Sequence, residues 1–278
     1  VGADPLRGMR TVLEARDDYR GLVDLQIVAM HGQQVDDGLV REAIAMGVDL
    51  IGAAPHLSDD PRAEIDRAAA FAESAGIGID LHTDETLNPD SLDLIDLAHR
   101  TRDWPSHMTR SAGHCVSLAM QSPERLAAAL DAAAEAQVSI IANPLTNLYL
   151  QGWDHPVASP RALPPLDAIL AAGISLAAGG DNVQDPFNPL GNGDMVDVAT
   201  ALVLAGHLTP RSAWQVVATG RDLLGLPSAT GHRGEVADML LVRANSVAEA
   251  LAERAPDRVV VRDGRVVATR STRSSVVP

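Results

Sequence analysis

The chain has 278 residues and a formal net charge of −15, which argues against a nucleic-acid partner, because binding a phosphate backbone requires clustered Lys and Arg. All 22 basic residues are Arg, and this excludes a Schiff-base lysine, a P-loop lysine and a carbamylated lysine that bridges two metal ions. Cys115 is the single cysteine, so an intramolecular disulfide and a cysteine-rich zinc site are excluded too. We expect a cytoplasmic protein with no membrane partner, because neither an 18-residue apolar run nor a signal peptide is visible.

Short apolar runs alternate along the chain with amphipathic helical stretches, a pattern typical of repeated strand–helix units. Six such units in succession predict a parallel sheet, because parallel strands need crossover connections. Start signals such as Ser122-Pro123-Glu124, with Ser as the cap and Pro at the first helical position, support the helices. The predicted strands are 24–30, 48–55, 76–82, 107–114, 138–144 and 174–180, and the predicted helices are 36–46, 60–75, 89–101, 122–136 and 163–172.

The fold class that fits this rhythm is α/β, a TIM-like (β/α)8 barrel over residues 1–232 that is incomplete at its N-terminus, with about six units. A doubly wound sheet would usually carry a Gly-rich turn after its first strand, and none occurs. Barrel enzymes keep their sites at the carboxyl ends of the strands, where this chain places Gln26, His56, His82, Glu85, His114, Asn143 and Asp181.

Residues 233–278 break the rhythm and predict a segment of a small β subdomain followed by a tail. The apolar run 235–242 and a helix near 246–254 precede two short strands within 258–269. Asp263-Gly264 between these strands is a strong hairpin signal.

Three strand ends supply His82, His114 and Asp181 to one mouth of the predicted barrel. Taken singly, His114 is equally typical of a satisfied core histidine, and Asp181 of a turn or a helix cap. Together, neutral imidazoles and a carboxylate suit one divalent ion such as Zn²⁺ or Fe²⁺. The ion would lower the pKa of a bound water, and Glu85 could carry the proton to a leaving nitrogen.

Eight segments follow one another along the chain: DLQIVA, GAAPH, LHTDE, SAGH, ANPLTNLYLQG, GGDNVQDPFNPLGNGDM, RGEVADMLLV and VVVRDGRVVA. In this order they resemble the cytosine deaminases of the amidohydrolase superfamily. The resemblance spans roughly residues 20–270, and the segments at 142–152 and 181–191 are far more specific than an isolated H-x-D-E. It implies a metal-dependent hydrolase that acts on C–N bonds other than peptide bonds, and a barrel flanked by a small β-sandwich.

The resemblance also implies roles at the matched positions. His82 matches the metal-ligating histidine of the fifth barrel strand, and Asp181 matches the carboxylate that binds the metal and accepts a proton from water. Glu85 matches the acid/base that moves a proton from water to the pyrimidine ring and the leaving amine. His114 matches the histidine that orients the attacking water.

Substrate contacts are expected from other positions. Gln26 matches the glutamine whose amide reads the ring carbonyl and N–H, and His56 is expected to support the metal ligands from behind. The chain departs from the cytosine enzymes at Asn182, where they have an aspartate, and at Phe187, where they have a tryptophan. Both changes alter the hydrogen-bonding pocket and could redirect the substrate. Trp153, just after the LQG segment, could line the pocket.

The first barrel strand of the superfamily carries an H-x-H pair of metal ligands, and no H-x-H occurs in this sequence. Aligned by its motifs, the chain begins at Val1 just after the second barrel strand. We therefore expect a chain that lacks the N-terminal part of the barrel, with weak metal binding and exposed sheet edges that favour a homo-oligomer.

Three functions remain open from the sequence. The first is hydrolytic deamination of a small aminated heterocycle, cytosine or a related pyrimidine. The second is hydrolysis of another cyclic C–N bond, such as that of an N-alkylamino triazine or a cyclic amide. The third is an inactive, truncated barrel. Cys115 beside His114 is expected to be a small buried side chain and not a nucleophile, and His31 and His155 are expected on surface loops.

Overall fold

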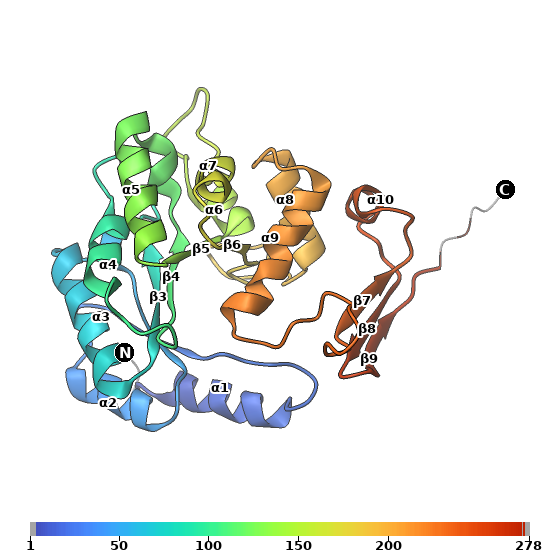
Figure 1. Ribbon diagram of the computed structural model, residues 1–278, viewed down its shortest axis with the longest axis horizontal. Helices are drawn as coiled ribbons and strands as arrows, with labels where there is room; N and C mark the ends of the chain where they lie inside the picture. The colour runs from blue at the N-terminus through green and yellow to red at the C-terminus, as the bar shows by residue number, and fades with distance from the viewer. Residues whose placement is uncertain (1–3, 274, 276–278) are drawn as a thin grey trace.

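A six-stranded parallel sheet forms the centre of the computed structural model, which describes residues 4–273 and 275. Its strands lie in chain order, each paired in parallel with the next (Figure 1). This confirms the predicted α/β class and its succession of strand–helix units. The strands are β1 (Val28–His31), β2 (Leu50–Ala53), β3 (Gly78–Thr83), β4 (Arg110–His114), β5 (Ser139–Ala142) and β6 (Leu176–Ala178).

The predicted crossover helices are present, and α2 to α5 cover the outer side of the sheet (Figure 1). Local signals start two of them: Asp60 caps α3 with Pro61 at its first position, and Ser122 caps α5. Gly76, at φ +66°, ends α3 in the left-handed conformation that glycine adopts without strain. The helices are α2 (Asp37–Ala45), α3 (Pro61–Ala75), α4 (Asp93–Thr101), α5 (Pro123–Glu135) and α7 (Leu166–Ala171).

One helix start was predicted four residues too early. Asn88-Pro89 does not begin α4, because the Asn88 side chain accepts the Asp90 amide and closes a turn. The helix begins at Asp93, where the Asp84 carboxylate from the end of β3 accepts the amides of Asp93 and Leu94. A cap supplied from nine residues away cannot be read from the local sequence.

Four α-helices lie outside the predicted set. Thr209-Pro210 is a cap signal of the kind used elsewhere in this chain, and the Thr209 hydroxyl does accept the Ser212 amide. The additional helices are α1 (Arg7–Asp18), α6 (Pro144–Leu150), α8 (Met195–Leu204) and α9 (Pro210–Leu223), with short 3₁₀ turns η1 (Pro55–Leu57) and η2 (Val116–Met120).

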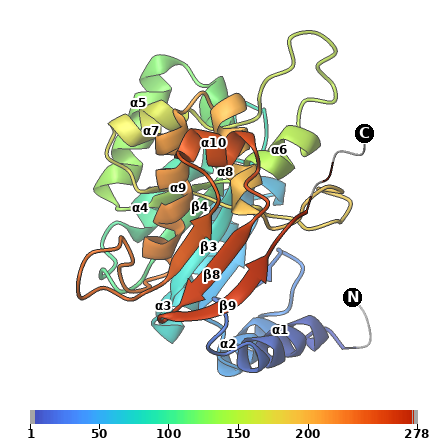
Figure 2. The same ribbon diagram turned by 90° about the vertical axis from the view of Figure 1, so that its right-hand side faces the viewer.

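The C-terminal part forms a separate three-stranded antiparallel sheet, nearest the viewer in Figure 2. It contains β7 (Met239–Val242), β8 (Arg258–Arg262) and β9 (Arg265–Arg270), with α10 (Val247–Ala252) between the first two. Asp263 and Gly264 join β8 to β9 with positive φ angles of 46° and 73°, as a two-residue hairpin turn requires. The predicted hairpin is therefore confirmed.

The core is aliphatic, as a chain with 3 % aromatic residues must make it. Alanines on the inner face of α3, such as Ala68 and Ala72, let the helix approach the sheet closely. Among the described residues, no helix has both the length and the apolar character needed to cross a bilayer. The largest fully buried side chains include Ile51, Ile79, Leu81, Leu94, Leu97 and Ile140.

Candidate active site

Polar side chains gather at the carboxyl edge of the parallel sheet, as expected for a barrel-type site. His82 lies near the end of β3, and Glu85 follows it in the loop that leads to α4. His114 is the last residue of β4. His56 lies in η1 after β2, and its Nδ1 is 3.0 Å from the backbone oxygen of His82.

The backbone turns sharply at these strand ends. Asp84, His114, Cys115 and Asp181 all have positive φ angles, at 56°, 71°, 49° and 56°. Residues with a side chain adopt this region only when the surrounding structure holds them there. At Asp84 the conformation is stabilised by the fully buried carboxylate, which accepts hydrogen bonds from the Ser91 hydroxyl and from two amides of α4.

The Glu85 carboxylate lies among three imidazoles. Its Oε1 is 3.2 Å from Nδ1 of His114, and its Oε2 is 3.8 Å from Nδ1 of His82 and 4.0 Å from Nε2 of His56. The side chain is 11 % exposed. The His82 and His114 rings lie with their centroids 4.8 Å apart. Four titratable groups from three strand ends therefore meet in one small volume.

These neighbours shift one another's pKa values in opposite directions. Burial raises the pKa of Glu85, but the nearby His82 and the charges of the other imidazoles favour its ionised form more strongly, so its pKa is lowered. Burial lowers the pKa of His82, but Glu85 outweighs burial and raises it. Burial dominates at His114 and lowers its pKa to about 4. At neutral pH the site therefore combines an ionised carboxylate with a neutral His114.

The donor set of this cluster fits a divalent cation. His82, Glu85 and His114 each offer one ligand atom, and these atoms all lie within 4.8 Å of one another. Two imidazole nitrogens and a carboxylate oxygen are ligands that Zn²⁺ and Fe²⁺ accept. The family resemblance implies that His82 and Asp181 bind the metal. This stays a prediction, since the set of neighbouring donor atoms contains Glu85 and His114 and does not contain Asp181.

Asp181 lies in the segment that follows β6, close enough to Glu85 and His82 for their charges to act on it. Its pKa is raised, because desolvation and the charge of Glu85 disfavour its ionised form. The nearby Thr146 side chain and the charge of His82 act in the opposite direction and favour the ionised form. A Cβ at Gly179, two residues earlier, would lie 2.9 Å from Oδ1 of Asn143, so a side chain there would displace the Asn143 amide.

The short helix α6 and its flanks supply polar contacts that had been assigned no role. Asn143 and Asn147 both contact the His114 ring, and Asn147 also donates to Glu85. Gln151 donates to the backbone oxygen of Glu85 at 3.1 Å. The signal was present: these three residues recur every four positions in ANPLTNLYLQG, and such residues share one face of a helix.

The residues predicted to bind substrate do not lie in the cluster around Glu85. Gln26 was wrongly placed at a strand's carboxyl end: it precedes β1 and lines a cavity of about 670 Å³ with residues at the amino ends of the strands, such as Val138 and Ile174. Phe187 and Trp153 are 53 % and 75 % exposed. Asn182 donates to Asp185 within its own turn, at 2.7 Å.

Comparison with known proteins agrees with this fold. The amidohydrolase family model matches residues 8–268, so the chain belongs to the amidohydrolase family. This confirms the family predicted from the sequence. Within it, the chain is 34 % identical over 269 residues to a pterin deaminase of Rhizobium rhizogenes (strain K84 / ATCC BAA-868), covering 91 % of this chain and 60 % of that protein.

Two further similar proteins differ from the pterin deaminase in the substrates that their names give. The chain is 26 % identical over 276 residues to N-isopropylammelide isopropyl amidohydrolase of Pseudomonas sp. (strain ADP), covering 94 % of this chain and 65 % of that protein. The structure of 5-methylcytosine deaminase from Klebsiella pneumoniae superposes with a TM-score of 0.87 at 23 % identity, over 98 % of this chain and 70 % of that one. The chain thus spans 60 to 65 % of the length of the two sequence relatives.

Proposed function

We propose that this protein hydrolyses an exocyclic C–N bond of an aminated heterocycle and releases ammonia. One observation carries the proposal: the Glu85 carboxylate lies within 4.0 Å of three imidazoles at the carboxyl edge of the sheet. Hydrolytic deamination needs a group that takes a proton from water and returns it to the ring nitrogen and the leaving amine. An ionised carboxylate with imidazoles in contact can do both.

His82 would hold a divalent cation together with Glu85 and His114, or with Asp181 as the family resemblance implies. When bound, such an ion lowers the pKa of a coordinated water. The protein's own groups act around it. With His82 and Asp181 as the ligands, Glu85 is free to accept and return the proton, and the neutral His114 ring can hold the water in place through a hydrogen bond. Asp181, with its raised pKa, is a second acceptor near Glu85.

The substrate class we propose is an amino group on a pyrimidine ring, either alone as in cytosine or fused as in a pterin. The family resemblance of the motifs supports the first, and the 34 % identity to a pterin deaminase supports the second. Asn182 and Phe187, at the positions where the cytosine enzymes differ, favour a substrate other than cytosine itself.

The test is ammonia release by the purified 278-residue chain from cytosine, 5-methylcytosine and pterin, with Zn²⁺ or Fe²⁺ added. We expect turnover of at least one of the three, and loss of at least ~100-fold in kcat in Glu85→Gln, in the range seen for a general acid–base group. Ammonia release at the same rate by Glu85→Gln would contradict the role of Glu85, and release from none of the three would overturn the proposal.

The second candidate is hydrolysis of an N-alkylamino triazine. The 26 % identity to N-isopropylammelide isopropyl amidohydrolase favours it. The same assay separates the two, because N-isopropylammelide would release isopropylamine and the aminopyrimidines ammonia.

A further inference from the structure

Glu85 lies at the centre of a three-residue turn just after β3. The Thr86 amide donates to the backbone oxygen of Asp84 at 2.8 Å, and this bond closes the turn. The same oxygen also accepts the Ser117 amide of η2 at 3.1 Å. The peptide group that joins Glu85 to Thr86 is therefore bound at its N–H end.

The carbonyl end of the same peptide group is bound by the residue that ends α6. Nε2 of Gln151 donates to the Glu85 backbone oxygen at 3.1 Å, and among the residues that the structure describes no other donor reaches this oxygen. A backbone oxygen can only accept, so the Gln151 amide must present its NH₂ group and not its oxygen. With both ends bound, the peptide group next to Glu85 is fixed in one orientation.

Gln151 is itself fixed by α6. Its backbone amide donates to the backbone oxygen of Asn147 at 3.1 Å, at the C-cap of the helix. The buried residues of the helix, Pro144, Thr146 and Asn147, anchor it in the interior of the protein. The donor to Glu85 therefore comes from a segment outside the loop that carries Glu85.

The far end of the loop that carries Glu85 is held by other side chains. Nε2 of Gln121 donates to the backbone oxygen of Pro89 at 2.8 Å, and the Ser117 hydroxyl donates to that of Ser91 at 2.6 Å. Both accepting residues lie at least four positions after Glu85 along the chain. Loss of the bond from α6 would therefore free the peptide group next to Glu85 and leave the rest of the loop in place.

We propose that Gln151 is a positioning residue, which sets where the Glu85 carboxylate lies in the site by binding the backbone oxygen of Glu85. An acid/base group must come within hydrogen-bond distance of the atom that it protonates. A misplacement of about 1 Å, caused by a change outside the reacting groups, can cost roughly 100-fold in rate. The inference rests on the proposed function for its meaning in catalysis, because Gln151 acts on the reaction only through Glu85.

The first test measures hydrogen exchange of the Thr86 amide by NMR in the ¹⁵N-labelled full chain without added metal. Gln151→Met keeps the length of the side chain and removes the donor, so the Thr86 amide should exchange roughly 3- to 10-fold faster, as expected for the loss of one hydrogen bond. Gln121→Met, which loses the bond to Pro89, is the matched control and should keep the wild-type rate at Thr86. A wild-type rate in Gln151→Met would overturn the proposal.

The second test measures turnover by the same two variants with the metal ion added. In Gln151→Met, kcat should fall about 10- to 100-fold while KM changes less than about threefold, because the altered group acts in the chemical step. Gln121→Met should keep kcat within about threefold of the wild type, since one lost hydrogen bond far from Glu85 affects mainly stability. Each variant loses a bond from a glutamine amide to a backbone oxygen of one loop, so an equal fall in kcat would show general loosening of the loop and refute the positioning role.

The two tests fail separately. If the wild type turns over no aminated heterocycle, the proposed function falls, while exchange at Thr86 still decides whether Gln151 fixes the peptide group. If exchange rises in Gln151→Met but kcat keeps its wild-type value, the bond exists and the positioning role is refuted. Should Gln151→Met not fold, Gln151→Leu, which also lacks a donor, replaces it in both tests.

Discussion

Two buried carboxylates near the site, those of Asp84 and Asp93, differ in how well their hydrogen-bonding capacity is satisfied. Asp84 is fully satisfied by one hydroxyl and two amides, and it fixes the turn between His82 and Glu85. Asp93 is 7 % exposed, and its Oδ2 has no hydrogen-bond partner among the residues that the structure describes. Burial and the charge of Asp84 raise the pKa of Asp93 from 3.8 to about 7.

A raised pKa means that Asp93 stabilises the fold fully at low pH and that this contribution is lost as the pH rises through about 7. Asp93→Asn should therefore raise the free energy of unfolding by roughly 1–3 kcal/mol at pH 8, and by little at pH 4. Urea unfolding at both pH values measures it. Asp90→Asn, at an exposed aspartate nearby, is the control and should follow the wild-type profile. Equal effects of Asp93→Asn at both pH values would contradict this assignment.

Cys115 is a buried side chain, as expected from the sequence. It is fully buried, and burial with the charges of Asp84 and Asp93 raises its thiol pKa. A thiolate is the reactive form. We expect the folded chain not to react with an aromatic disulfide reagent at pH 8, and the chain unfolded in guanidinium to react with one equivalent. Rapid labelling of the folded chain would show that the thiol is accessible.

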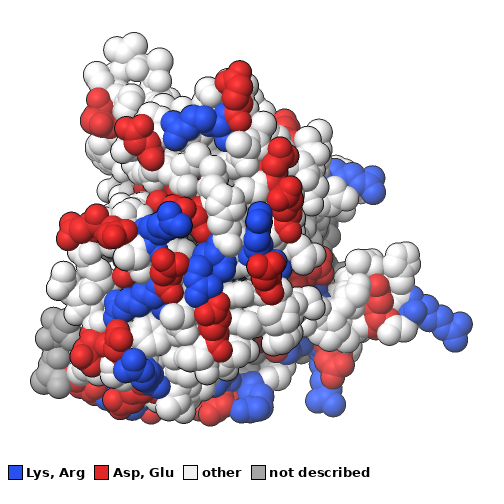
Figure 3. All heavy atoms as spheres, turned by 60° about the vertical axis from the view of Figure 1, so that its left-hand side comes forward, with Lys and Arg blue, Asp and Glu red and all other residues white. Residues whose placement is uncertain are grey.

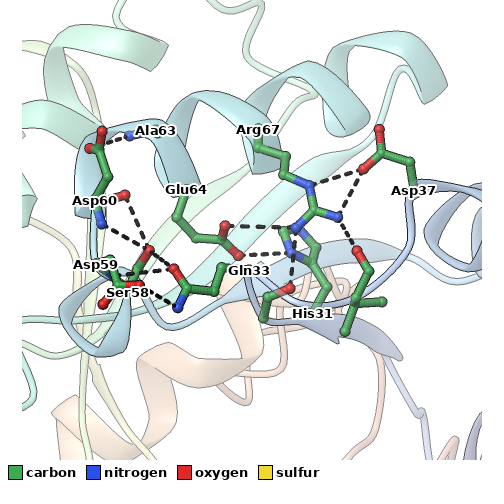
Figure 4. A network of polar contacts seen from close by, with 11 residues as sticks. His31, Gln33, Asp37, Ser58, Asp59, Asp60, Ala63, Glu64 and Arg67 are labelled. Carbon is green, nitrogen blue, oxygen red and sulfur yellow. Dashed lines mark hydrogen bonds and ion pairs between the residues drawn. The ribbon is translucent and has the colours of Figure 1, made fainter.

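At the scale of elements, His31 corrects an expectation. It was predicted on a surface loop, but it is the last residue of β1 and is buried against Phe71, with Nδ1 3.0 Å from Glu64 of α3. Figure 4 shows the surrounding polar network. The sequence offered no sign of it, because the partners lie more than thirty residues apart. His155, in contrast, lies on a loop as expected.

Arg67 of α3 holds the loop that follows β1. It donates to the backbone oxygens of Gly32 and Val35 and to the Asp37 carboxylate (Figure 4). Arg67→Gln should lower the free energy of unfolding by about 1–3 kcal/mol, since several charge-assisted hydrogen bonds are lost. It should also speed amide hydrogen exchange in residues 32–37.

Arg62→Gln, at an exposed position of the same helix, is the control for Arg67. It should leave both measurements unchanged. Unchanged exchange in residues 32–37 of Arg67→Gln would show that the loop is held by other contacts.

At the scale of the whole molecule, two of the side-chain contacts that join the C-terminal part to the rest come from β8. Arg258 of β8 donates to Asp194 at 2.8 Å, and Arg262 donates to Asp24 at 2.6 Å. Asp194 also caps α8. Elsewhere the surface mixes charges of both signs, and on the face drawn in Figure 3 basic side chains lie among acidic ones. Arg100, for example, pairs with Asp66 and Glu73.

The Arg258 contact is partly buried, so its loss should be measurable. Arg258→Met should lower the free energy of unfolding by about 1–3 kcal/mol and speed hydrogen exchange in β7 to β9. Arg243→Met, at an arginine whose side chain is almost wholly in solvent, is the control. Equal behaviour of the two variants would show that the C-terminal sheet is held mainly by other contacts. The boundary predicted at residue 232 and the homo-oligomer both stay predictions.

Metal binding should stabilise the whole fold, because an ion that binds only the native state adds RT ln(1 + [L]/Kd). At a free Zn²⁺ concentration about 100 times Kd this is about 2.7 kcal/mol, visible as a rise in Tm. His82→Asn should abolish most of the rise, and His155→Asn, at a loop histidine, should not. A full rise in His82→Asn would place the ion elsewhere.

The sequence by itself determined the parallel sheet, the hairpin at Asp263-Gly264, the family and the groups His82, Glu85 and His114. These follow from periodicity, from turn chemistry and from short motifs, all of which are local. Only the tertiary structure decided that Asp84 starts α4, that His31 is buried, that Gln26 lies at the opposite end of the sheet, and that α6 reaches the site. Each of these depends on contacts between residues distant in sequence, which local patterns do not encode.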